Sequence, residues 1–123
     1  MSQLGMAARP AQLRKRLLDH ALALPETYID HPWGEDVVKV RKKVVVFFGM
    51  ANSDDPGMTV KLPASQALAL AQPGVTVPGY GLGDSGWVSV RLSDCTMPYE
   101  LLCEWIDESY RAVAPKRLQA MTS

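Results

Sequence analysis

The feature that most constrains the fold of this chain is a change in the period of its hydrophobic residues. Within residues 38–62 apolar and polar side chains alternate, as in Val38-Lys39-Val40. Such alternation is typical of strands that bury one face of a sheet. The stretch 43–50 is β-branched and aromatic on both faces, which favours an interior strand, and a polar turn follows it. This part of the chain therefore predicts a meander of antiparallel strands.

Helical spacing replaces the alternation on either side of this region. The stretch 11–24 has apolar residues at the spacing of one helix face, and Pro25 ends it. The stretch 63–72 is rich in Ala and Leu and predicts a short helix, whereas 98–114 has the apolar spacing of a long one. Between these two helices, residues 87–92 alternate as a further strand. The order of helix, three to four strands, helix, strand and helix predicts an α+β domain whose antiparallel sheet has its helices packed on one face.

The length of the chain suits a single folded unit. A domain of 123 residues buries roughly 65 to 70% of the surface that its unfolded chain exposes, which supports a core without crosslinks. We expect one domain over 1–123, with flexible ends at 1–9 and 116–123. The sequence shows no secretory signal and no apolar run long enough for a bilayer, so no membrane association is expected. Cys95 and Cys103 are expected to be free thiols in a reducing compartment, which favours the cytoplasm.

Two short motifs resemble catalytic ones, but their contexts argue against an enzyme. The stretch 81–86 has the G-x-G-x-x-G spelling of a dinucleotide site, yet a strand and not a helix is expected after it. A hydrolytic triad would require a histidine beside Ser85, and His31 belongs to a predicted turn with Trp33 as its aromatic anchor. A small hydrolase that uses the glycine-rich loop is therefore the least favoured function. The histidines and cysteines lack the spacing of metal ligands, so we expect no metal and no cofactor.

Charge is balanced over the whole molecule but segregated along the chain. Thirteen Lys and Arg residues oppose thirteen Asp and Glu residues, so any binding of a polyanion must be local. If the alternation holds, four cations, Lys39, Arg41, Lys61 and Arg91, lie with Trp87 on the sheet face opposite the helices. Sheet faces that carry cations and an aromatic ring bind phosphates and stack bases. The cluster at the predicted hairpin tip, Arg41, Lys42 and Lys43, extends this charge.

This charge pattern leads to a functional hypothesis of a non-enzymatic module that binds DNA phosphates. The predicted contacts are Lys39, Arg41, Lys42, Lys43, Lys61 and Arg91, with Trp87 as a stacking residue. A plainer interpretation stays open, in which the cations belong to a solvated sheet face and the tryptophan completes a core. The alternative function is a protein–protein adaptor that pairs through a sheet face or edge, with another protein or with a second copy of the chain.

Several short motifs of the chain occur together in one order. They are Leu24-Pro25, Pro32-Trp33-Gly34, Val38-Lys39-Val40, Val60-Lys61-Leu62, Gly86-Trp87-Val88 and Ile106-Asp107-Glu108-Ser109-Tyr110. In this combination the region from Leu13 to Leu118 resembles the MmcQ/YjbR family of small bacterial proteins. The resemblance implies a compact α+β domain with helices against an antiparallel sheet, a suggested role in DNA binding, and no catalytic residues. The chain departs from many relatives at Arg41-Lys42, where they have glycine, and at Asp84, where they have a base.

Overall fold

The structure of the protein is a computed structural model. It describes residues 2–51, 53–79 and 81–122, with side chains from residue 9 to residue 121 within these ranges. The described residues confirm the α+β fold, because they form a six-stranded antiparallel sheet whose order is β1-β2-β3-β4-β6-β5. The helices are α1 (Ser2–Leu22), α2 (Gln66–Leu70), α3 (Tyr99–Val113) and α4 (Lys116–Gln119). The strands are β1 (Thr27–Asp30), β2 (Glu35–Val40), β3 (Lys43–Met50), β4 (Gly57–Lys61), β5 (Val75–Thr76) and β6 (Trp87–Arg91).

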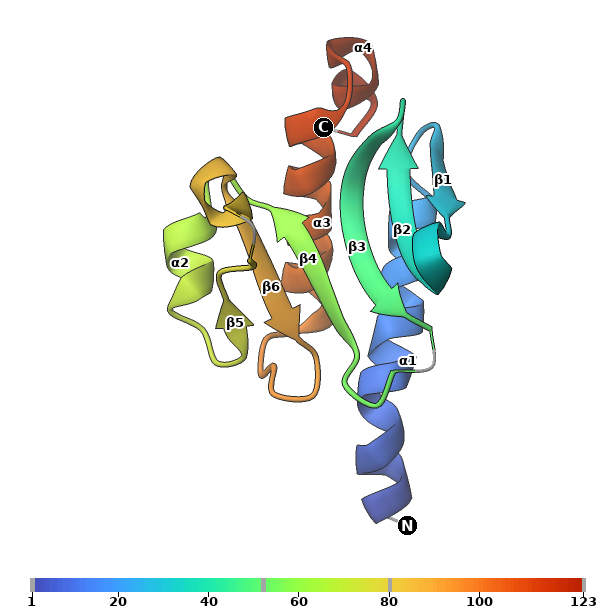
Figure 1. The fold of residues 1–123 in the computed structure, drawn as a ribbon, viewed down its shortest axis with the longest axis vertical. Helices are drawn as coiled ribbons and strands as arrows, with labels where there is room; N and C mark the ends of the chain where they lie inside the picture. The colour runs from blue at the N-terminus through green and yellow to red at the C-terminus, as the bar shows by residue number, and fades with distance from the viewer. Residues whose placement is uncertain (1, 52, 80, 123) are drawn as a thin grey trace.

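The two long helices define the layers of the fold. Figure 1 shows α1 and α3 side by side against one face of the sheet, and these helices contact each other as well as β3. The opposite face of the sheet carries no helix in the described part of the chain (Figure 1). We call this second face the open face. The prediction that the helices pack on one face is therefore confirmed.

The hydrophobic core lies between the helices and the sheet. Leu17 of α1 and Ile106 of α3 are fully buried there. On β4 and β6 the buried side chains of the core occur at alternate positions, namely Met58, Val60, Val88 and Val90, and Trp87 is buried as well, outside this core cluster. Because side chains of a strand alternate between its faces, the residues between these four point to the open face. The period of two therefore predicted the orientation of both strands.

Several element boundaries differ from those predicted. Helix α1 begins at Ser2 and contains Pro10, which the sequence favoured as a first-turn residue. Helix α2 begins at Gln66, three residues after the predicted start, because the carboxylate of Glu108 accepts the backbone N–H groups of Ala64 and Ser65 and holds them in a turn. The expectation of flexible ends at 1–9 and 116–123 stays a prediction, although the structure places helix in both.

Two elements were not predicted. Strand β5 has only two residues and lies in the Gly- and Pro-rich stretch 73–86, where a loop was expected; its Val75 pairs with Val90 of β6. Helix α4 follows Pro115, which ends α3 as expected but begins a further turn of helix. Both elements are too short to show a hydrophobic period. Strand β5 forms one edge of the sheet, and α4 places charged residues at one end of the sheet.

A buried serine separates two central strands. Strands β3 and β4 pair at Val46 with Val60 and at Phe47 with Thr59. Beyond them the fully buried Ser109 of α3 accepts the backbone N–H of Lys61 at 2.9 Å and donates its hydroxyl to the carbonyl of Val45 at 2.6 Å. The hydroxyl thus takes the place of a direct bond between the strands and ties both to α3.

A buried ion pair joins α1 to the sheet. Arg14 is 8% exposed, and its guanidinium donates to the carboxylate of Asp36 at 2.8 Å. The same group donates to the carbonyls of Phe48 and Gly49 at 3.3 and 3.1 Å and lies 5.6 Å from the centre of the Phe48 ring. Since every buried charge here has a partner, the pair holds the middle of α1 in one position over β2 and β3.

Candidate nucleic-acid interface

The strand register determines which predicted residues share a face. Lys61 lies opposite Trp87, and Gly57 lies opposite Arg91, in the pairing of β4 with β6. Residues directly opposite each other in an antiparallel pair point to the same side. Trp87 and Arg91 alternate with the buried Val88 and Val90, and so these cations and the indole belong to the open face. Lys39, between the buried residues of β2, lies on this face as well.

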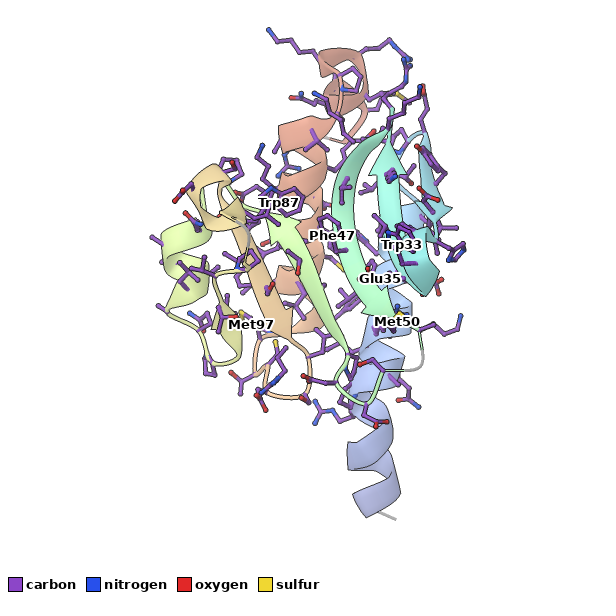
Figure 2. The ribbon with its side chains drawn as sticks, in the orientation of Figure 1. Trp33, Glu35, Phe47, Met50, Trp87 and Met97 are labelled. Carbon is purple, nitrogen blue, oxygen red and sulfur yellow. The ribbon has the colours of Figure 1, made fainter. Side chains whose placement is uncertain are left out.

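Trp87 does not present a free ring. Its exposed fraction is 8%, and its ring meets that of Phe47 edge to face, with 5.5 Å between the centroids. Figure 2 shows the two residues near each other at the middle of the sheet. An aromatic pair in this arrangement stabilises the open face through burial and the contact of ring edge with ring face. A base would have to displace this contact in order to stack on the indole.

Acidic neighbours pair with two of the predicted cations on the open face, Lys39 and Arg91. The ammonium of Lys39 lies 2.7 Å from the carboxylate of Asp30 on β1. Arg91 contacts Asp55 at 3.1 Å and Asp94 at 3.4 Å. The hydrogen bond from Lys39 lowers the pKa of Asp30 and, in return, the bond from Asp30 raises the pKa of Lys39. These cations therefore contribute little net charge to the open face.

The end of the open face around Arg91 is a groove of about 520 Å³. Its charged lining residues are Glu35, Asp55 and Asp94 with Arg91, so three carboxylates oppose one guanidinium. Phe47 and the half-exposed Met50 add apolar surface, and Figure 2 labels both with Glu35. A phosphate at this end of the sheet would meet net negative charge, which disfavours it there.

The hairpin between β2 and β3 has an unusual turn. Its two central residues, Arg41 and Lys42, have φ values of 51° and 70° and lie in the left-handed region. A two-residue hairpin requires this geometry to match the twist of its strands, and Asn-Gly or Gly-Gly normally supplies it. Here the side chains of Arg41, Lys42 and Lys43 are exposed instead. The turn therefore presents Arg41 and Lys42 at some conformational cost, next to Lys43 at the start of β3, and Arg41 lies in the turn and not on the strand face where it was predicted.

Helix α4 adds two further cations at the same end of the molecule (Figure 1). Arg41 and Arg117 each contact the carboxylate of Glu26 at 3.0 Å, one on each oxygen. Glu26 has a φ of 60°, and the turn before it is held by the buried Tyr110, whose hydroxyl donates to the carbonyl of Pro25 at 2.8 Å. Hydrogen bonds lower the pKa of Glu26, and the one from Arg41 has a larger effect than the one from Arg117.

We call this cluster the basic tip and define it as Arg41, Lys42, Lys43, Lys116 and Arg117. Two of its five cations, Arg41 and Arg117, contact the carboxylate of Glu26, and among the described residues no acid pairs with the three lysines. Sequence reasoning placed the first three at a hairpin tip but missed the two from α4. No local signal could have joined them, because Arg117 and Glu26 are 91 positions apart. Lys61, at the end of β4, has no ion-pair partner among the described side chains either.

The residues considered for catalysis lie apart. Ser85 precedes β6 and His31 precedes β2, and two strands lie between these, which separates them laterally by roughly 14 Å. Because β2 and β6 run in opposite directions, the two residues also lie at opposite ends of the sheet. His31 contacts Asp36 at 3.0 Å. The turn predicted around it is present, but Trp33 is 94% exposed, so its role as an aromatic anchor was wrong.

The described residues provide neither a metal-binding cluster nor a membrane-spanning helix. They contain no group of three or more His, Cys, Asp or Glu side chains placed to hold a metal ion. Within the same ranges, none of the helices combines the length and hydropathy needed to cross a membrane. Cys95 and Cys103 are both free thiols.

Comparisons with known proteins give a family from one source and the fold from two others. The YjbR family model matches residues 22–112. A crystal structure of a Deinococcus radiodurans protein with the DUF419 domain is similar, with a TM-score of 0.67 and 27% identity over 84% of this chain and 79% of that one. A Pseudomonas syringae protein shares the fold, with a TM-score of 0.62 and 21% identity over 80% of this chain and 97% of the other. None of the curated proteins matches the chain in sequence. Because the family model spans most of its length, the chain belongs to the YjbR family.

Proposed function

We propose that this YjbR-family protein is a non-enzymatic, cytoplasmic module that binds nucleic acid through the phosphate backbone, with the basic tip as its contact surface. The observation that carries the proposal is the convergence of two basic clusters, distant in sequence, around the single carboxylate of Glu26. Such a local excess of exposed cations on a molecule with no net charge favours a polyanion at one place only.

The proposal uses some of the residues predicted from the sequence and reduces the role of others. Arg41, Lys42 and Lys43 belong to the basic tip, and Lys61 lies at the same end of the sheet. Lys39 and Arg91 pair with acids, and Trp87 packs against Phe47. These last three are therefore expected to support the fold of the open face more than to contact a ligand.

The basic tip has consequences for how binding depends on salt and sequence. Its five cations and one acid leave about four positive charges for phosphates. A plot of the logarithm of the binding constant against the logarithm of the salt concentration should then have a slope of about −3.6 on duplex DNA. Lysine and arginine contacts to phosphates carry no base information. We therefore expect weak sequence preference and affinity that falls steeply as salt rises.

A titration of labelled duplex and single-stranded DNA at several salt concentrations tests the proposal. The variant Lys42→Gln with Lys43→Gln should lower both the affinity and the salt slope. The matched control for Lys42→Gln alone is Lys15→Gln, which removes one exposed cation from α1 instead. Absence of binding at low salt, or an equal loss in the control, would contradict the proposal.

A second candidate is a protein partner on the open face, and one observation favours it. Trp33 and Met50 are 94% and 52% exposed, and the acidic groove around Arg91 lies beside Met50. An exposed tryptophan next to carboxylates suits a basic peptide segment, because cations bind both groups. The double variant Trp33→Ser and Met50→Ser separates the two functions. It should abolish capture of a basic peptide and leave DNA binding unchanged, whereas undiminished capture of the peptide would contradict the partner surface.

A further inference from the structure

The second large cavity of the described residues lies between α1 and the segment that joins β6 to α3. Its volume is about 690 Å³. Helix α1 contributes Arg9, Leu13 and Arg16, and the segment across from it contributes Leu92, Met97 and Tyr99. The lining thus combines apolar side chains with two guanidinium groups. The cavity is of the size that accepts a small organic molecule.

The charge of this cavity has one sign. Arg9 and Arg16 are its only acidic or basic lining residues, apart from the weakly acidic Cys95 and Tyr99. They are seven positions apart, which places them on one face of α1 two turns from each other. The acids nearest in sequence to the joining segment, Asp94 and Glu100, do not line the cavity. Asp94 contacts Arg91 instead.

Arg16 is held in place without being neutralised. Its guanidinium lies 3.9 Å from the centre of the Tyr99 ring, and no acid pairs with it among the described side chains. A hydrogen bond with Cys103 raises the pKa of Tyr99, and burial raises it further. Burial also raises the pKa of Cys103. Both groups beside Arg16 therefore stay neutral at physiological pH. Stacking on the ring fixes the plane of the guanidinium and leaves its N–H donors at the edge free for an oxyanion.

Neutral hydrogen-bond donors complete the lining. The hydroxyls of Ser93 and Thr96 and the amide of Gln12 face the same cavity. Pro98 and Tyr99, where α3 begins, also line it, and no side chain caps this end of the helix. These groups suit the oxygen atoms of an acidic group next to Arg16, and the leucines and Met97 suit an apolar body.

We propose that this cavity binds a small organic anion, with its carboxylate or phosphate group on Arg16 and its apolar body against Leu13 and Met97. The site is separate from the basic tip. It lies at the first turn of α3, whereas the tip lies beyond the last turn of that helix, roughly 22 Å away along its axis. The proposal therefore stands whether or not the protein binds nucleic acid.

The test is a titration of the full-length ¹⁵N-labelled protein, followed by amide chemical shifts. The probes are phenyl phosphate and benzoate, which share an aromatic body and differ in the acidic group, with phenol and inorganic phosphate as fragments that lack one part. Saturable shifts centred on residues 93–99 are expected with at least one of the two complete probes. The probe that binds more tightly identifies the acidic group.

Two exposed positions on α1 provide the variants. Arg16→Gln should weaken the complete probe by about tenfold or more, because it removes a charge-assisted bond. Lys15→Gln removes the same charge from the neighbouring position, which does not line the cavity, and should leave affinity unchanged. Absence of saturable shifts, equal binding of phenol, or an Arg16→Gln affinity equal to that of the wild type would overturn the proposal. Equal binding of inorganic phosphate would overturn the part that assigns an apolar body.

Discussion

Replacing Ser109 by alanine tests whether α3 holds β3 and β4 apart. In the wild type the serine hydroxyl accepts the N–H of Lys61 and donates to the carbonyl of Val45, and the residue is fully buried. Alanine fits the same space but leaves both backbone groups without a partner. Water cannot replace the hydroxyl at a site with no exposure, and so the cost falls on the folded state.

The magnitude follows from the two bonds. A buried polar group left without a partner costs about 1 to 3 kcal/mol. Two such groups, partly relieved by relaxation of the strands, predict a loss of about 2 to 4 kcal/mol in the free energy of unfolding. For a domain of this size, 1 kcal/mol lowers the melting temperature by roughly 4 °C, so a decrease of about 8 to 16 °C is expected.

Urea unfolding and hydrogen exchange measure the effect. The midpoint should fall with an unchanged slope, and the amide of Lys61 should exchange faster than in the wild type. Ser89→Ala is the control, because its hydroxyl bonds only to that of Thr59 on the half-buried open face and should cost less. If Ser109→Ala unfolds within 0.5 kcal/mol of the wild type (roughly the scatter of neutral surface changes), the strands close on each other directly and the reasoning is wrong.

Three further predictions concern the charged groups. Lys42→Gly should raise the free energy of unfolding by about 0.5 to 1 kcal/mol, because glycine adopts the φ of 70° without strain. The same variant should weaken DNA binding. A lower urea midpoint would contradict the reasoning from the turn geometry. Glu26→Gln should tighten DNA binding and steepen the salt slope, measured by anisotropy, because it frees Arg41 and Arg117. The pKa of Glu26 is lowered from its ordinary value of 4.5. Its ion pairs therefore stabilise the fold fully at pH values above 4.5, and this stabilisation is lost as the pH falls through the folded pKa. The variant should lose this part of the pH dependence of unfolding. Asp36→Asn should cost about 3 to 5 kcal/mol by leaving Arg14 buried without its carboxylate, and the double variant Arg14→Met with Asp36→Leu should be more stable than Asp36→Asn when both are unfolded in urea.

The sequence predicted the fold where elements are long enough to show a period. Strands β4 and β6 alternate over five residues each, and their side chains face the expected sides, although Trp87 is buried on the open face against Phe47. Strand β5 has two residues and no period, so only its pairing with β6 reveals it. The start of α2 depends on Glu108, more than 40 positions away, and no local propensity reports such a contact.

The candidate site was predictable in its cations but not in their partners. The period of two placed Lys39 and Arg91 on one face, whereas the acids that pair with them come from β1, from the turn before β4 and from the segment after β6. Those positions depend on register and loop geometry. The same limit hid the link between Arg41 and Arg117, which exists only because both reach Glu26.

The left-handed turn between β2 and β3 places two demands on the same two residues. Its backbone is easiest for glycine or asparagine, whereas its charge comes from arginine and lysine. Arg41 and Lys42 are therefore the residues at which the stability of the domain and the proposed attraction for an acidic ligand make opposite demands, whereas no core residue is subject to both. Substitutions in this turn are therefore the first choice for a more stable variant, and they should lower its affinity for polyanions.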